Sequence, residues 1–127
     1  MTELTRVHTS NAPAAVGPYS QGVKAGNMMF VSGQMPVVPA TGEVVEGDAG
    51  EKARQCMENV LAILKEGGLT ADNIIKTTIF LTDINDFGAV NEVYASFFGE
   101  KYPARSCVEV SRLPKGVDVE IEAIAVY

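Results

Sequence analysis

The spacing of apolar residues changes at Asp48, and this change most narrows the folds open to the chain. After Asp48, apolar residues recur every three and four positions, which predicts an amphipathic helix that stops at Gly67-Gly68. Residues 73–81 are then rich in β-branched side chains, which predicts a strand buried on both faces. A chain that alternates these two patterns is expected to pack helices against a sheet.

The rest of the chain continues this alternation. The further predicted elements are an edge strand at 5–9, a hairpin of 19–25 and 28–34 with its turn at Gly26-Asn27, a loop or minor ribbon at 36–46, a second helix that Asp83 or Asn85 caps and Gly99 ends, and two C-terminal strands at 103–110 and 117–126. These elements predict an α+β fold with one mixed sheet and two helices packed on one face. The opposite face, which carries Ile and Val from several strands, is expected to need a partner, so we predict an oligomer.

The two C-terminal strands carry charge where a buried strand is normally apolar. The segment 113–116 separates them, because proline cannot donate within a ladder and glycine readily takes positive φ. Arg105 and Cys107 share one parity in the first strand, and Glu120 and Glu122 share one parity in the second. Buried charge is costly unless it is paired. We therefore expect Arg105 and Glu120, on neighbouring strands, to point into one partly closed cleft.

Composition limits the class of protein. The 127 residues are expected to form a single domain, 1–127, with 46% apolar residues and a net charge of −6. The acidic balance argues against a nucleic-acid partner, which needs clustered basic residues. No segment resembles a signal peptide or reaches the roughly 18 apolar residues of a membrane span, so we expect a cytoplasmic protein with no membrane partner.

The reactive side chains are few. Cys56 and Cys107 are expected to be thiols, and Cys56 lies on the apolar stripe of the first predicted helix. The single histidine, His8, has no cluster of ligand residues at metal spacing, so no metal and no cofactor is predicted. Acid–base chemistry would then fall to carboxylates, tyrosine, cysteine or water.

Five blocks of sequence occur in an order that is typical of one family. They are Gly17–Gly22, Ser32–Gln34, Asn85–Asn91, Pro103–Val110 and Val119–Ile124. From about residue 7 to residue 126, the chain resembles the reactive intermediate deaminase family, also called Rid, YjgF-like or L-PSP endoribonuclease, and is most similar to its RidA subgroup. It departs from that pattern in two turns: the approach to Pro103 is shorter than in some members, and Gly116 stands where many have aspartate.

The resemblance implies a chorismate-mutase-like fold and a homotrimer. It also implies clefts between subunits that hydrolyse 2-imino or 2-enamino acids, such as 2-iminopropanoate and 2-iminobutanoate, to 2-keto acids and ammonia. Arg105 matches the family's carboxylate binder, and Glu120 matches the residue that positions the attacking water. The other residues that match the cleft are Tyr19, Ser32 with Gly33, and Cys107, together with Phe87 and Asn91 from the neighbouring subunit.

Each assignment has a structural alternative. Arg105 could form an ion pair with Glu120 or Glu122, and Glu122 is expected to be structural. Without a histidine or second cysteine nearby, Cys107 is expected to line the cleft rather than act as a nucleophile. Tyr19 could simply pack over the hairpin. At the level of the whole protein, the alternatives are a keto- or imino-acid binding module without turnover and a ribonuclease or translation inhibitor, which the acidic charge disfavours.

Overall fold

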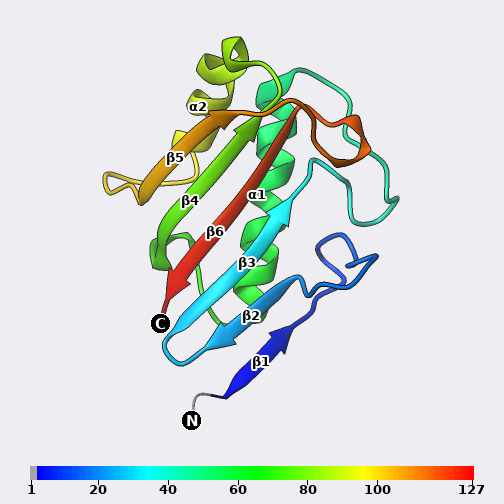
Figure 1. The fold of residues 1–127 in the computed structure, drawn as a ribbon. Helices are drawn as coiled ribbons and strands as arrows, with labels where there is room; N and C mark the ends of the chain where they lie inside the picture. The colour runs from blue at the N-terminus through cyan, green and yellow to red at the C-terminus, as the bar shows by residue number, and fades with distance from the viewer. Residues whose placement is uncertain (1–2) are drawn as a thin grey trace.

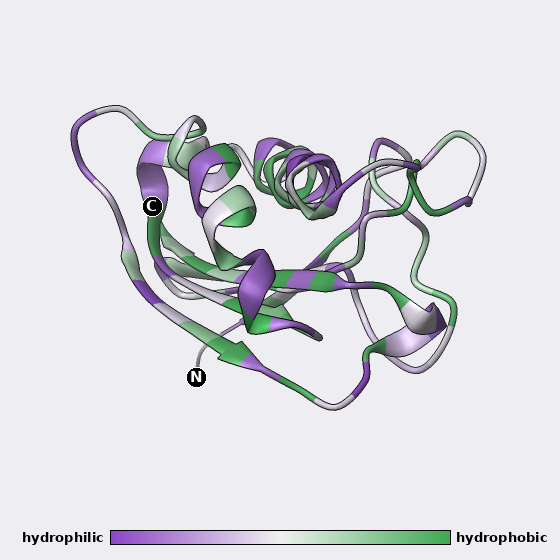
Figure 2. Cartoon of the chain, turned by 90° about the horizontal axis from the view of Figure 1, so that it is seen from above, coloured by the Kyte–Doolittle hydropathy of each residue, from purple (hydrophilic) through white to green (hydrophobic). Residues whose placement is uncertain are grey.

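The computed structural model describes residues 3–127 and contains one six-stranded mixed sheet with two α-helices on the same side (Figure 1). Its strands are β1 (Leu4–Val7), β2 (Gly22–Ala25), β3 (Met28–Gln34), β4 (Ile74–Leu81), β5 (Ala104–Glu109) and β6 (Val119–Val126), and its α-helices are α1 (Ala49–Glu66) and α2 (Phe87–Ala95). Three short 3-10 helices add η1 (Ala71–Asn73), η2 (Ile84–Asp86) and η3 (Pro114–Gly116). The predicted α+β fold with two helices on one face is confirmed (Figure 2).

Helix α1 begins where its sequence predicts. Asp48 is the N-cap, and its side chain accepts a hydrogen bond of 2.9 Å from the backbone N–H of Glu51. The apolar stripe of α1, including Met57 and Val60, is fully buried against the sheet. At the other end, the N–H of Gly67 donates to the carbonyl of Ile63, which closes the last turn.

The order of the strands is β1-β2-β3-β6-β4-β5. The hairpin of β2 and β3 turns at Gly26, whose φ of 61° is one that glycine adopts without strain. The 36–46 segment forms a loop with one antiparallel bridge between Val37 and Val44, as predicted.

Strand β4 lies between β5 and β6, parallel to the former and antiparallel to the latter. The expectation that the two C-terminal strands are neighbours is therefore wrong.

Two further predictions need correction. Strand β4 buries only one face in the chain: Ile79 is fully buried, whereas Thr78 and Phe80 on the other side are half-buried. Helix α2 ends at Ala95 rather than near Gly99. Beyond Ala95, successive N–H groups bond to carbonyls three residues back instead of four, so the chain tightens into 3-10 turns and leaves the helix.

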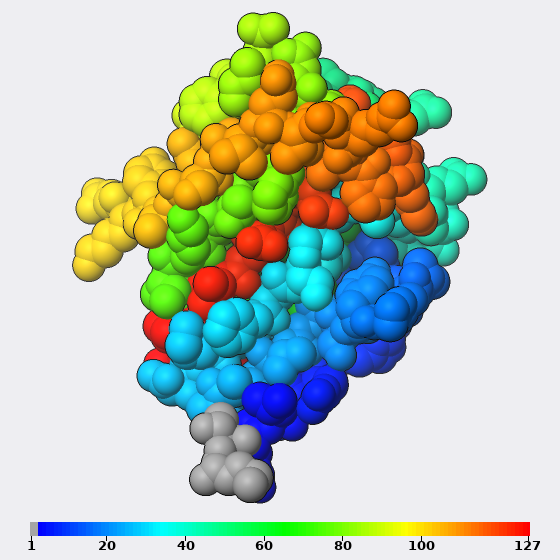
Figure 3. Space-filling view, viewed as in Figure 1, coloured from blue at the N-terminus to red at the C-terminus, as the bar shows by residue number. Residues whose placement is uncertain are grey.

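The face of the sheet that the helices do not cover is called the open face below. Figure 3 shows it as a surface on which β3, β6 and β4 lie side by side. It carries large apolar side chains, among them Phe30 at 43% exposed and Val108 at 42% exposed. Within residues 3–127, no helix is both long and apolar enough to cross a membrane.

Candidate functional site

Arg105 lies on β5 and is held by three side chains of α2. Its Nη1 donates a hydrogen bond of 2.7 Å to Oδ1 of Asn91. Its Cζ atom lies 5.3 Å from the centre of the Phe87 ring and 5.1 Å from the centre of the Tyr94 ring, both within cation–π range. The spacing of these residues along α2, four and three positions apart, places them on one face of the helix.

Arg105 has no carboxylate partner in the part of the chain that the structure describes. The one salt bridge among residues 3–127 joins Lys52 to Asp118. Tyr94 cannot supply a negative charge either, because burial raises the pKa of its phenol despite the opposing effects of its hydrogen bond to Thr77 and of Arg105. The structural alternative for Arg105, an ion pair with Glu120 or Glu122, is therefore not what the chain forms. Apart from the bond to Asn91, the N–H donors of the guanidinium have no hydrogen-bond partner among residues 3–127.

A pocket of about 460 Å3 opens beside this guanidinium, called the Arg105 pocket below. Its lining residues are Asn91, Tyr94, Ala95, Tyr102, Pro103 and Arg105. Arg105 is its one charged lining residue. An arginine that is held by an amide and two rings at the wall of a pocket is suited to bind a planar carboxylate through two hydrogen bonds.

Glu120 lies on β6 and belongs to a different pocket. Its side chain lies on the open face, on the same side of β6 as that of Glu122. Burial, and to a lesser extent the nearby Glu122 carboxylate, raise the pKa of Glu120 above its usual range. A carboxyl group with a raised pKa can take up and release a proton closer to neutral pH than an ordinary glutamate.

The pocket at Glu120, called the Glu120 pocket below, has a volume of about 590 Å3. Its lining residues are Val16, Tyr19, Ser32, Gly33, Met35, Pro114, Lys115, Glu120 and Glu122. Figure 3 shows the 16–19 loop and the segment before β6 standing forward on either side of β3 and β6 here. Of the predicted site residues, this pocket brings together Tyr19, Ser32, Gly33 and Glu120.

Ser32 lies in the Glu120 pocket, but its hydroxyl is not free to donate a hydrogen bond to a substrate. Its hydroxyl donates a hydrogen bond of 2.6 Å to the carbonyl of Ser20, so its proton is already committed within the chain. The side chain keeps acceptor capacity only, and it lies beside Glu120 rather than beside Arg105. Within one chain, Ser32 is therefore not placed to share a substrate carboxylate with Arg105.

Arg105 and Glu120 point to opposite faces of the sheet. Arg105 lies opposite Thr77 in the β4–β5 register, and the side chain of Thr77 is buried on the helix side. Glu120 lies opposite Phe80 in the β4–β6 register, on the open side. Directly opposed residues share a face of a sheet. The prediction that Arg105 and Glu120 converge on one cleft is therefore wrong for a single chain.

The remaining predicted residues lie on the Arg105 side. Asn91 and Phe87 contact Arg105 of their own chain, so no neighbouring subunit is needed to bring them there. Cys107, two positions from Arg105 on β5, is half-buried on the same face. Burial raises the pKa of its thiol and Arg105 opposes that rise, so the group is no activated thiolate.

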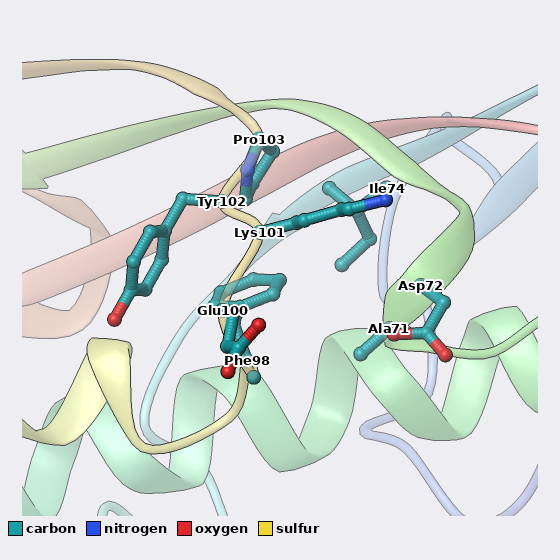
Figure 4. Close-up of a pocket in the computed structure, with 9 residues that line it drawn as sticks. Ala71, Asp72, Ile74, Phe98, Glu100, Lys101, Tyr102 and Pro103 are labelled. Carbon is teal, nitrogen blue, oxygen red and sulfur yellow. The ribbon is translucent and has the colours of Figure 1, made fainter.

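A third cavity, of about 550 Å3, lies at the sheet edge between η1 and the loop before β5 (Figure 4). Its charged lining residues, Asp72, Glu100 and Lys101, are exposed to solvent. It shares only Tyr102 and Pro103 with the Arg105 pocket and contains neither Arg105 nor Glu120. Among residues 3–127, no group of three or more His, Cys, Asp or Glu side chains is placed to hold a metal ion.

Comparison with known proteins places this arrangement in a family. Residues 9–127 match the family described as Endoribonuclease L-PSP. The chain belongs to this family. It is the Rid, or YjgF-like, family that the five sequence blocks resemble.

Individual relatives are similar over almost their whole length. A protein of Escherichia coli K12 named 2-iminobutanoate/2-iminopropanoate deaminase is 57% identical over 123 residues, which cover 94% of this chain and 95% of the relative. The crystal structure of the YjgF gene product of E. coli has a TM-score of 0.92 at 55% identity and covers 96% of this chain and 98% of its own. The structure of E. coli TdcF with bound serine has a TM-score of 0.93 at 54% identity, covering 97% and 98%.

Gly33 permits the observed position of the Glu120 carboxylate. A Cβ atom at Gly33 would lie 2.8 Å from both Cδ and Oε2 of Glu120, closer than such atoms approach. We expect Gly33→Ala to fold normally, because the flexible end of the Glu120 side chain can shift, but to lower turnover by about tenfold or more through misplacement of the carboxylate. Gly99→Ala is the matched control, since its Cβ would meet no atom within 4 Å. Equal turnover in the two variants would contradict this role for Gly33.

Proposed function

We propose that this protein is a 2-iminobutanoate/2-iminopropanoate deaminase, which hydrolyses 2-imino acids to 2-keto acids and ammonia. The observation that carries the proposal is Arg105, a guanidinium with no carboxylate partner in its own chain, fixed at the wall of a pocket. Relatives that are 57% identical over 94% of the chain bear this name. A location in the cytoplasm, which the sequence predicts, is part of the same proposal.

The chemistry needs two groups. Arg105 binds the substrate carboxylate, which leaves the C=N carbon of the imine accessible to water. The Glu120 carboxylate takes a proton from that water as its oxygen bonds to the imine carbon, which forms a carbinolamine. Glu120 delivers this proton to the nitrogen, then takes the proton of the carbinolamine hydroxyl as the C=O bond forms and passes it to the departing nitrogen. The C–N bond breaks, and ammonia and the 2-keto acid result. Free imines already hydrolyse in water, so positioning and proton transfer are sufficient catalysis.

Two chains are needed to bring these groups together. Because Arg105 and Glu120 lie on opposite faces of one sheet, we propose that Arg105 of one copy meets Glu120 of the next. Contact between two different surfaces is a head-to-tail interface, and such an interface forms a ring when the rotation from one copy to the next closes. The apolar open face, with Phe30 and Val108, supplies the surface that such contact would bury. The homotrimer that the sequence resemblance implies is a ring of this kind.

The family description also names an endoribonuclease activity. A net charge of −6 is unfavourable for a polyanionic substrate. A pocket with one unpaired guanidinium suits one small monoanion better than a chain of phosphates. We therefore prefer the deaminase.

A coupled assay tests the proposal. An amino-acid oxidase generates 2-iminopropanoate from alanine in the presence of the purified protein, and the decay of the imine is followed by trapping with semicarbazide. We expect the protein to speed imine loss in proportion to its concentration. No acceleration above the spontaneous rate for the alanine-derived or the 2-aminobutanoate-derived imine would disprove the function.

The raised pKa of Glu120 predicts a pH dependence. Glu120 must be ionised to accept a proton from water, so kcat is expected to fall as pH drops through its raised pKa. Glu122→Gln removes a nearby negative charge that contributes to the shift, which lowers the pKa of Glu120. The acid limb of the pH–rate profile is therefore expected to move to lower pH in this variant. Superimposable profiles of the variant and the unaltered protein would contradict the coupling.

A further inference from the structure

Tyr94 is a buried residue of α2 whose surroundings are polar and specific. Its side chain is only 3% exposed. Its hydroxyl shares a buried hydrogen bond of 2.7 Å with the hydroxyl of Thr77. The face of its ring lies 5.1 Å from Cζ of Arg105. One side chain of α2 therefore connects the sheet to the guanidinium.

Thr77 fixes the position of that ring. Thr77 is fully buried in β4, and its neighbour across the ladder in β5 is Arg105 itself. The backbone that carries the guanidinium and the hydroxyl that holds the Tyr94 ring are thus adjacent and rigid. A buried hydroxyl needs a partner, so each hydroxyl keeps the other in place.

We propose that Tyr94, held by Thr77, is a positioning residue that fixes the guanidinium of Arg105 for carboxylate binding. This inference rests on the proposed function for its link to turnover, although carboxylate binding can be measured without turnover. Asn91 fixes one edge of the guanidinium through a hydrogen bond, and the ring of Tyr94 supports its face. With edge and face both constrained, the guanidinium keeps a fixed position at the wall of the Arg105 pocket.

The kinetic signature follows from where the reaction occurs. The carboxylate of the substrate is the same in the ground state and in the transition state, because the bonds that change are at the imine carbon. An interaction that holds this carboxylate is therefore uniform binding, and its loss raises KM more than it lowers kcat. A residue that only supports the fold would lower thermal stability without this selective effect.

The experiment compares pyruvate binding, KM and melting temperature in four variants. Tyr94→Leu removes the ring, and we expect it to weaken pyruvate binding and raise KM for 2-iminopropanoate by about two- to fivefold, the range of a partly exposed cation–π contact. Tyr94→Phe and Thr77→Val each remove the same hydrogen bond, so we expect equal, smaller effects. Val90→Ala, at a fully buried position of the same helix, is the control that lowers the melting temperature and leaves pyruvate binding unchanged.

The outcomes are distinct. Unchanged pyruvate affinity in Tyr94→Leu, or equal weakening of the uncharged analogue pyruvamide, would overturn the inference. If Tyr94→Leu does not fold, the two single hydrogen-bond variants decide: their combination must weaken pyruvate binding no further than either alone. Failure of the unaltered protein to bind pyruvate also overturns the inference. Pyruvate binding without imine hydrolysis overturns the proposed function alone.

Discussion

Replacing Arg105 with lysine is expected to lower kcat/KM for 2-iminopropanoate by about 10- to 100-fold, because lysine loses the two-point, charge-assisted contact with the carboxylate. Lysine keeps the positive charge, so the change isolates geometry from charge. It also loses the planar group that lies against the rings of Phe87 and Tyr94. The fold is expected to survive, since Arg105 is half-buried and forms no salt bridge among the described residues. Steady-state kinetics and circular dichroism check these two points.

Lys101→Ala serves as the control for this prediction. Lys101 is an exposed cation in the cavity of Figure 4, on the loop that precedes β5, and it does not line the Arg105 pocket. Because Lys101→Ala removes a positive charge and leaves the guanidinium in place, it shows what loss of charge alone does to turnover. Near-normal turnover in Arg105→Lys would refute the carboxylate-binding role.

Replacing Glu120 with glutamine is expected to lower kcat by about 10²- to 10⁴-fold, the contribution typical of a positioned general base. Glutamine has nearly the same shape and can still hydrogen-bond to water, but it cannot accept a proton. Because the carboxylate of the substrate is held by Arg105, pyruvate should bind the variant with little change. Isothermal titration with pyruvate, run beside the imine assay, measures both properties.

The same variant separates the deaminase from a protein that only binds keto or imino acids. A binding module needs Arg105 but is indifferent to Glu120→Gln. Ammonia release by Glu120→Gln at the rate of the unaltered protein would contradict the mechanism. Comparison of Glu120→Gln with Arg105→Lys shows whether the Glu120 pocket supports proton transfer and the Arg105 pocket supports carboxylate binding.

Mixing the two variants tests whether each active site draws on two chains. Co-expressed Arg105→Ala and Glu120→Gln subunits, each inactive alone, would combine at random in a head-to-tail ring. At each interface, the chance that one chain supplies an intact Arg105 and the next an intact Glu120 is about one quarter, so roughly that fraction of activity should return. If both groups had to come from the same chain, no activity would return.

The sequence predicts the elements of this fold well and their arrangement less well. The spacing of apolar residues locates α1 and its Asp48 cap to within a residue, and the proline and glycine of segment 113–116 correctly predict the break between β5 and β6. Side-chain parity also groups Glu120 with Glu122 on one face of β6. These features are local, since they depend on residues a few positions apart along the chain.

The pairing of strands is not local, and this is where the sequence misleads. Parity tells which residues of one strand share a face, but it does not tell which face of the sheet that is. With β4 inserted between β5 and β6, Arg105 turns toward the helices and Glu120 turns away. The role of Tyr94 is hidden in the sequence for a related reason. A tyrosine at an apolar position of a helix predicts a core side chain, whereas its hydrogen bond to Thr77 depends on how the helix packs in the folded chain.

The unpaired state of Arg105 has a consequence for enzyme inhibition. Hydrolysis of the imine leaves the carboxylate of the molecule untouched, so the 2-keto acid that forms can hold the guanidinium as firmly as its precursor did. The keto acid must then dissociate without any change in the charge of its carboxylate to weaken the contact with Arg105. Accumulated keto acids, and small monocarboxylates of similar shape, should compete for the same guanidinium and slow the enzyme in proportion to their concentration.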